Sequence, residues 1–183
     1  MKTKADRIWE YCEFFGGHPF VPVEALDELG FFTAPASTKY HGAYEGGLFD
    51  HSLEVAKQLV NLTEKLGLKW EKSKAPHIVG MFHDLCKCGN YVEINTFEED
   101  APTGIKYKFN PDLIIPGHGE KSVIMLQKLM KIGDEEIACI RWHMGAFETD
   151  TKLWDYYGRA IEKYPNVLYT HTADMIASRI IGV

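Results

Sequence analysis

The sequence predicts an all-α domain that carries one small β-hairpin, around residues 91–109. Two observations lead to this fold class. Apolar residues recur every three or four positions through most of the 183-residue chain, which is the spacing of one helix face. Between Cys88 and Pro116 the spacing changes to every second residue, which is typical of a strand. With 45% hydrophobic residues, the chain can form a substantial core.

The first predicted core helix spans residues 48–66. Leu48, Val55 and Leu59 share one face of it, and Gly67 ends the segment. His51 falls on the same inward face. An unpaired polar group in a core costs on the order of one to three kcal/mol, so this imidazole needs a partner. A metal ion is one such partner.

A second helix is predicted after Pro76, and its inward face carries Val79, His83 and Cys86. Two further helices are expected at 119–131 and 135–143, the second with His143 inward.

The last predicted helix opens at Pro165, and Asp174 lies on a mixed stripe of this helix. A buried carboxylate in such a place needs a cation or several hydrogen-bond donors. The stripe is formed by Val167, His171, Asp174, Ser178 and Ile181.

The predicted hairpin pairs Tyr91–Asn95 with a segment in which Ile105, Tyr107 and Phe109 alternate with two lysines. An acidic turn at 98–100 would join the strands. A solvated insertion is the favoured interpretation of this hairpin. The alternative is a lid that brings Lys106 or Lys108 to a functional site.

Six residues that can each hold a metal ion are spread along these segments. They are His51, His83, Asp84, His118, His143 and Asp174. Four imidazoles and two carboxylates supply enough donors for two ions that share a bridging carboxylate. This donor set suits iron, manganese, cobalt, nickel or zinc, as two divalent or mixed-valent ions.

The adjacent pair His83-Asp84 is the most informative part of this set. On an ideal helix, neighbouring side chains diverge by roughly 100°, but at a helix end both can reach one centre. Two ions about 3.5 to 4 Å apart suit the hydrolysis of a phosphoester. Lys87 follows one turn after His83, where its ammonium could balance a phosphate oxygen. A solvated lysine at a helix C-terminus explains the spacing equally well.

The segments around these residues resemble the HD-domain metal-dependent phosphohydrolase superfamily, over roughly residues 40–180. The segment 46–56 is especially similar to the HD domains of bacterial 3′-to-5′ exoribonucleases. Residues 82–87 resemble the family's His-Asp-x-Gly-Lys signature, with Cys86 in place of glycine. The segments 116–119, 141–145 and 172–177 are similar to the later ligand segments of the binuclear branch.

The resemblance implies an HD-domain helical bundle at 41–183, preceded by an N-terminal helical extension, residues 1–40, packed on the core. It implies a first metal ion bound by His51, His83, Asp84 and Asp174. A second ion would be held by His118 and His143 and bridged by Asp84. Asp84 and Lys87 are then the expected catalytic residues.

The expected activity is that of a phosphohydrolase or phosphodiesterase in which two metal ions activate a hydroxide. The expected substrate is a nucleotide or a short oligonucleotide. A formal net charge of −6 argues against an extended nucleic acid, which needs a basic surface. The exoribonucleases also carry a separate nucleic-acid-binding domain, and nothing of that size precedes Tyr40. Candidate substrate contacts are His41, Lys87, Lys106, Lys108 and Arg141.

Two alternatives stay open. Mixed-valent di-iron oxygenases of the same superfamily use a similar ligand set, and Tyr44 and Glu45 could then gate the site or contact the substrate. A noncatalytic binding module could retain a metal for stability alone.

The sequence shows neither a secretory signal nor a membrane span, so a cytoplasmic location with reduced cysteines is expected. The oligomeric state is not predicted.

Overall fold

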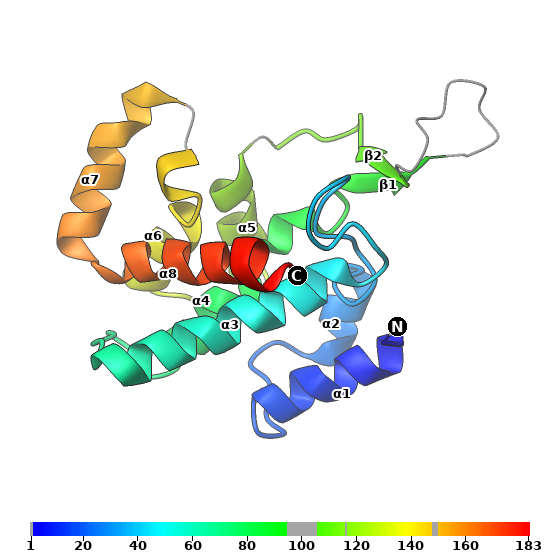
Figure 1. The fold of residues 1–183 in the computed structure, drawn as a ribbon, viewed down its shortest axis with the longest axis horizontal. Coiled ribbons are helices and arrows are strands. Elements are labelled where there is room, and N and C mark those ends of the chain that lie inside the picture. Colours follow the sequence, from blue (N-terminus) through cyan, green and yellow to red (C-terminus); the bar gives the residue numbers. More distant parts are fainter. Residues whose placement is uncertain (1, 95–105, 116, 148–149) are drawn as a thin grey trace.

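The computed structural model describes residues 2–94, 106–115, 117–147 and 150–183. Within these ranges the chain is mostly helical, and its two short strands form one two-stranded sheet (Figure 1). The predicted all-α fold class with a small hairpin is therefore confirmed. Among the helices in the described ranges, none combines the length and the apolar character needed to cross a membrane.

Helices of two to five turns build the domain, and short 3-10 or π segments connect or extend them. The α-helices are α1 (Lys4–Phe14), α2 (Val23–Glu28), α3 (Gly47–Leu66), α4 (Ala75–Phe82), α5 (His118–Gln127), α6 (Asp134–Arg141), α7 (Trp154–Lys163) and α8 (Asn166–Met175). The 3-10 turns are η1 (Leu85–Lys87), η2 (Gly145–Phe147) and η3 (Thr151–Leu153), and the π segment η4 (Ile176–Ile181) continues α8.

Helix α3 is the long central element, and its observed span confirms the helix predicted at 48–66. Its predicted inward face is buried, and His51 is fully buried with it. Helices α4 and α8 both pack against α3, and α8 runs alongside it in Figure 1. The chain end after α8 returns to α3, where the Val183 carbonyl lies 2.9 Å from His51 Nδ1.

Three helices end earlier than the sequence predicts. Helix α5 ends at Gln127 instead of residue 131, and the early ends of α4 and α6 each carry a candidate metal ligand. Helix α4 ends at Phe82, because Asp84 leaves the helical region at φ −107° and ψ 19°. Cys86 therefore lies in a 3-10 turn, and its predicted place on a helix face is wrong. Helix α6 ends at Arg141 in the same way, with Trp142 at φ −107° and ψ 14°. The early ends of α4 and α6 each turn a histidine back toward the helix that precedes it.

Helices α2 and α7 are not predicted by the sequence analysis. The first has six residues, too few for a clear periodic pattern. The second has no fully buried residue, although Tyr157, Ala160 and Ile161 pack against the core from one side. Because only one stripe of α7 touches the core, its apolar residues do not form a clear helical pattern in the sequence.

The predicted hairpin is present as β1 (Tyr91–Glu93) paired antiparallel with β2 (Tyr107–Phe109). Tyr91 lies opposite Phe109, with ring centroids 5.3 Å apart. The expected acidic turn at 98–104 lies outside the described residues. The hairpin follows shortly after η1, the turn that carries Cys86 and Lys87.

The first forty residues share the hydrophobic core of the rest of the chain. Tyr11, Phe31 and Phe32 are fully buried in one aromatic cluster with Phe49 of α3 and Phe82 of α4. Edge-to-face ring pairs of this kind add about 0.5–1.5 kcal/mol each beyond the area that they bury. Phe82 is the last residue of α4, so the cluster packs directly before the turn that carries His83 and Asp84 and helps to hold it in place.

Close packing of α3 against α4 provides a test of this architecture. A Cβ atom added at Gly80 would overlap the backbone of Ala56, so we expect Gly80→Ala to lower the free energy of unfolding by about 1–3 kcal/mol. Gly158→Ala, on α7, is the matched control, because a Cβ there meets nothing and alanine favours the helix by about 0.5–1 kcal/mol. Urea unfolding measures both. Equal stability of the Gly80→Ala variant and the wild type would contradict the helix contact.

Candidate metal centre

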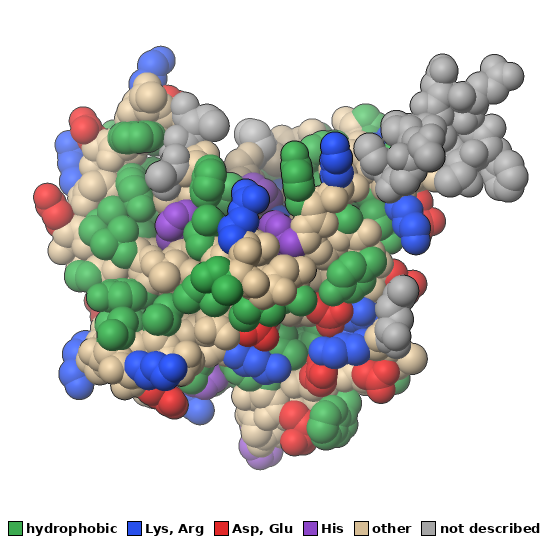
Figure 2. Space-filling view, viewed as in Figure 1, with side chains coloured by type: hydrophobic (Ala, Val, Ile, Leu, Met, Phe, Trp, Pro, Cys, Tyr) green, Lys and Arg blue, Asp and Glu red, His purple; other side chains and the backbone are tan. Residues whose placement is uncertain are grey.

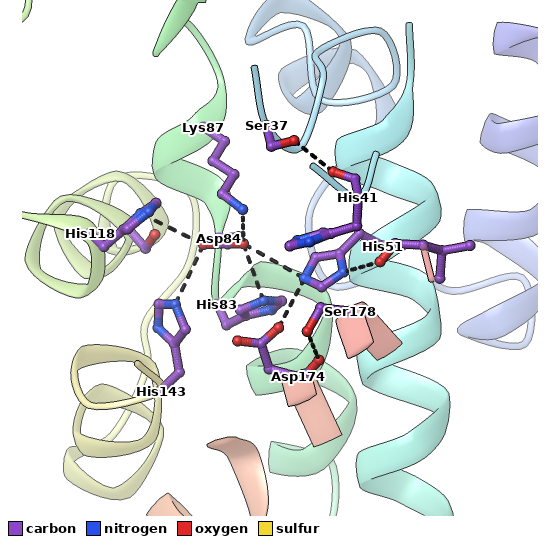
Figure 3. Close-up of polar contacts among 12 residues, drawn as sticks. Ser37, His41, His51, His83, Asp84, Lys87, His118, His143, Asp174 and Ser178 are labelled. Atoms are coloured by element: carbon purple, nitrogen blue, oxygen red, sulfur yellow. Dashed lines mark hydrogen bonds and ion pairs between the residues drawn. The ribbon is translucent and has the colours of Figure 1, made fainter. Parts of the chain in front are cut away.

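Asp84 lies at the centre of a group of side chains from five parts of the chain (Figure 3). His51 comes from α3, His83 from the end of α4, and His118 from the first residue of α5. His143 follows the end of α6, and Asp174 lies near the end of α8. Figure 2 shows histidine side chains in the hollowed upper face of the molecule, between hydrophobic and basic side chains.

The two carboxylate oxygens of Asp84 face two different pairs of histidines. Oδ2 lies 3.4 Å from His83 Nε2 and 3.7 Å from His51 Nε2. Oδ1 lies 3.4 Å from His143 Nε2 and 3.7 Å from His118 Nδ1. Figure 3 shows His118 and His143 on one side of the carboxylate and His51 on the other. Asp84 is therefore placed between two sets of donors.

Asp174 belongs to the set on the Oδ2 side. Its Oδ1 lies 3.3 Å from His51 Nε2. His51, His83 and Asp174 each offer one ligand atom within 4.8 Å of the others, which is close enough to hold one metal ion. His83, Asp84 and His143 form a second such group, and Asp84, Cys86 and His118 form a third.

Close contact between α5 and α6 brings His118 toward His143. A Cβ atom at Gly119 would overlap the backbone of Arg141, so glycine at this position permits the close approach of the two helices. The rings of His118 and His143 lie 6.1 Å apart as a result.

Three of the histidines are oriented by carbonyl groups of the main chain. His83 Nδ1 lies 2.8 Å from the Gly80 carbonyl, and His143 Nδ1 lies 2.7 Å from the Ile140 carbonyl. His51 Nδ1 lies 2.9 Å from the carbonyl of the last residue of the chain. A carbonyl accepts only, so each Nδ1 donates to it, and in the neutral imidazole each Nε2 is then the nitrogen that can bind a metal ion.

The atoms that face the centre have no hydrogen-bond partner. Among the described residues, the buried and unpaired side-chain atoms include His51 Nε2, His83 Nε2, His143 Nε2 and Asp84 Oδ1. Each such atom costs about 1–3 kcal/mol, and acceptors cannot satisfy one another. Metal cations bound among them would satisfy these atoms. The donor set and its orientation thus fit a metal ion.

The charges of these groups support the same conclusion. Burial alone would raise the pKa of Asp84, but the Lys87 ammonium and His83 hold this pKa well below its ordinary value. The pKa of Asp174 is also lowered, since the contact with His51 outweighs the effect of burial. Burial lowers the pKa of His118 to about 4, so its imidazole is neutral at neutral pH. Burial lowers the pKa of His83, but Asp84 beside it raises this pKa overall. The ionised carboxylates and the neutral His118 are the forms that bind metals, and a bound ion would displace a proton from His83.

A cavity of about 280 Å³ opens above the centre. Asp84, Lys87, His118 and Asp174 form its polar base. The other lining residues are Ala36, Ser37, Tyr40, His41, Tyr91, Met144, Phe147, Met175, Ser178 and Arg179. The centre is therefore open to a small molecule.

A family model for the HD domain matches residues 48–178. The chain belongs to the HD domain family. The matched segment begins before His51 and ends after Asp174, so it includes all six candidate ligands. HD domains are in general metal-dependent phosphohydrolases, and the His and Asp groups described above could hold such a metal. No curated protein and no solved structure matches the chain.

Lys87 lies at the centre of the HD domain, in a different secondary structure from the one predicted. The sequence analysis places it on a helix one turn after His83, whereas it lies in the 3-10 turn η1. Its side chain is 7% exposed, and its Nζ lies 2.6 Å from Asp84 Oδ2. Although burial opposes it, this ion pair raises the pKa of Lys87. The lysine therefore carries a charge and lines the cavity.

The other candidate substrate contacts of the HD domain fall into two groups. His41 lines the cavity, with its ring 4.9 Å from that of His51, and burial lowers its pKa to about 4. Lys106 and Lys108 are exposed on the hairpin and do not line the cavity. Arg141 contacts Glu120 at 2.5 Å and stacks on Trp142, also away from the cavity.

Several contributors to the site are missed by the sequence analysis. Cys86 faces His118, with Sγ 3.0 Å from Nδ1, and its replacement of the signature glycine was the only available signal. Arg179 and Tyr40 line the cavity without any motif that would identify them. His171 also contacts a ligand residue, because its Nδ1 lies 2.8 Å from the carbonyl of His143.

The ion pair between Asp84 and Lys87 gives a prediction for the metal-free protein. In the presence of a chelator, Asp84→Ala leaves the lysine charge buried without its partner, and we expect a loss of about 3–5 kcal/mol in the free energy of unfolding. Adding Lys87→Met should restore part of this loss, because it removes the unpaired charge. Urea unfolding tests both variants. If the double variant is less stable than Asp84→Ala alone, the ion pair does not have this role.

Proposed function

We propose that the protein hydrolyses a phosphoester bond in a nucleotide or a short oligonucleotide, with two divalent metal ions bridged by Asp84. The observation that carries this proposal is the position of the Asp84 carboxylate. Its two oxygens face separate histidine pairs, and three of those four histidines present a buried, unpaired nitrogen. A single ion would leave some of these atoms unsatisfied.

The residues divide naturally between two ions. His51, His83, Asp174 and Asp84 Oδ2 would hold the first ion, and His118, His143 and Asp84 Oδ1 the second. When bound, two such ions about 3.5–4 Å apart supply an activated water and stabilise the charge that develops in an in-line displacement at phosphorus. This arrangement supports membership of the binuclear branch of the family.

Lys87 is suited to a role in binding the substrate phosphate. Its ammonium lies at the base of the cavity, and in the metal-free structure it neutralises Asp84. If metal ions were bound by the Asp84 carboxylate, the Lys87 ammonium would be available to a phosphate oxygen of the substrate. A positioned cation of this kind stabilises the transition state more than the ground state, because negative charge increases there.

The cavity suits a small substrate, such as one nucleotide unit that is partly exposed. Its volume of about 280 Å³ lies just below the range of roughly 300–1,000 Å³ for ligand sites. Tyr40, Tyr91 and Phe147 contribute aromatic rings to its wall, and such rings stack on bases without demanding one sequence. His41 adds a neutral imidazole that can donate or accept a hydrogen bond. The net charge of −6 disfavours a long nucleic acid.

The residues considered for an oxygenase do not line this cavity. The Tyr44 hydroxyl donates to Asp50 Oδ2 at 3.2 Å, beside Arg7, and lines a different hollow from the one above the ligands. Glu45 lies near Gly30 and the β-hairpin. Their positions give no support for oxygen chemistry, whereas the position of Lys87 supports phosphate chemistry.

Metal content and turnover together test the proposal. Elemental mass spectrometry of anaerobically purified protein should find near two metal ions per chain, and bis-p-nitrophenyl phosphate should be hydrolysed in the presence of manganese. Asp84→Ala should abolish turnover, because it removes a ligand from both ions. Two irons with no ester hydrolysis and an oxygen-dependent mixed-valent signal would instead show an oxygenase. A bound metal that raises the melting temperature without any turnover would show a structural site.

The role of Lys87 gives a separate prediction. Lys87→Met should lower kcat for the phosphodiester by about 10²–10³-fold, which is the usual effect of losing one group that stabilises transition-state charge. Its metal content should stay at the wild-type level. Lys128→Met, an exposed lysine after α5, is the control and should leave kcat unchanged. A normal kcat for Lys87→Met would exclude a phosphate role for this lysine.

A further inference from the structure

Cys86 is a buried side chain that the proposed hydrolysis does not use. It is fully buried, and its Sγ lies 3.0 Å from His118 Nδ1. One ligand atom from each of Asp84, Cys86 and His118 lies within 4.8 Å of the others. The signature that residues 82–87 resemble has glycine at this position, where this chain has a cysteine.

His118 differs from the other histidines in the nitrogen that it directs to the centre. The other three present Nε2, whereas His118 turns Nδ1 toward Asp84 Oδ1, at 3.7 Å. The same Nδ1 is the neighbour of Cys86 Sγ. Without a metal ion, the neutral imidazole can accept the thiol proton in a hydrogen bond. With an ion on Nδ1, this lone pair is occupied, and the sulfur lies beside the same ion.

We propose that Cys86 is a thiolate ligand of the metal ion held by Asp84, His118 and His143, and that it makes this position selective for zinc, cobalt or ferrous iron over manganese or magnesium. The inference rests on the proposed metal centre and adds one ligand to it. On binding, the S–H bond breaks, the proton leaves to solvent and a metal–sulfur bond forms, with no change in oxidation state. Thiolate ligands favour the softer ions of the series.

Independent observations point to an ion at this place. Asp84 Oδ1 and His143 Nε2 are both buried, and neither has a hydrogen-bond partner. Asp84 belongs both to the group with His83 and His143 and to the group with Cys86 and His118, so an ion bound at Oδ1 would lie between His143 and the thiol. Bond lengths of about 2.3 Å to sulfur and 2.0–2.1 Å to nitrogen place these two atoms about 3.6 Å apart. The observed 3.0 Å requires only a small shift.

The backbone of Cys86 is fixed relative to His118. Its N–H donates to Ser122 Oγ at 3.1 Å, and Ser122 is a buried residue one turn after His118 on α5. This bond joins η1 to α5 and limits the movement of the sulfur relative to the imidazole. The thiol is therefore held at the site.

Cobalt absorption spectroscopy tests the thiolate directly. Metal-free protein is titrated with cobalt(II), and a cobalt–thiolate bond produces a charge-transfer band in the near ultraviolet that nitrogen and oxygen ligands do not produce. We expect this band in the wild type and in Cys88→Ser. Cys88 is a buried cysteine two residues away that belongs to none of the ligand groups, so it is the matched control. The band should be absent in Cys86→Ser.

The binding of zinc and manganese gives a second readout. Zinc affinity should fall about tenfold or more in Cys86→Ser, since loss of even an outer partner of a ligand costs 10–100-fold. Manganese affinity should change less. Equal losses for the two metals would contradict the proposed selectivity.

The outcomes separate this inference from the proposed function. Cobalt that binds the wild type without a sulfur band would overturn the thiolate ligand, and the two-metal hydrolase would stand. A failure of the wild type to bind cobalt, zinc or manganese would overturn both. If Cys86→Ser does not fold, the wild-type spectrum and the Cys88→Ser spectrum still decide the question.

Discussion

A buried carboxylate between two histidine pairs is the constraint on which the site depends. Asp84 is almost fully buried and ionised, so it requires positive charge on both of its oxygens. Lys87 meets part of this requirement at Oδ2, and Oδ1 lies between His118 and His143 without a hydrogen-bond partner. Metal ions bound there would supply positive charge to this oxygen.

The ends of two helices orient histidines around Asp84. Helices α4 and α6 stop just before a histidine, and in each case its Nδ1 returns to the carbonyl three residues earlier. A continued helix would direct these side chains along its face instead. The last residues after the π segment provide the corresponding carbonyl for His51. Main-chain carbonyls therefore orient three ligands without the use of further charged side chains.

The fold class and the six candidate ligands could be predicted from the sequence because their signals are local. Apolar spacing reports a helix face, and the adjacent pair His83-Asp84 is a short motif. The ends of α4 and α6 could not be predicted, because the apolar pattern continues past the residues where the backbone turns. The positions of Cys86, Arg179 and Arg141 depend on contacts between distant segments, which spacing does not record. For the same reason, Lys106 and Lys108 could be placed on the hairpin but not relative to the cavity.

The proposed function requires each carboxylate oxygen of Asp84 to bind a different metal ion. The most direct test is a crystal structure of the protein grown with cobalt(II), with diffraction data collected at the cobalt absorption edge. If two metal ions are bound, the anomalous difference map should show two peaks about 3.5–4 Å apart. One should lie among His51, His83 and Asp174, and the other between His118 and His143, with Asp84 between the peaks. A single peak, or peaks that do not contact Asp84, would contradict this requirement.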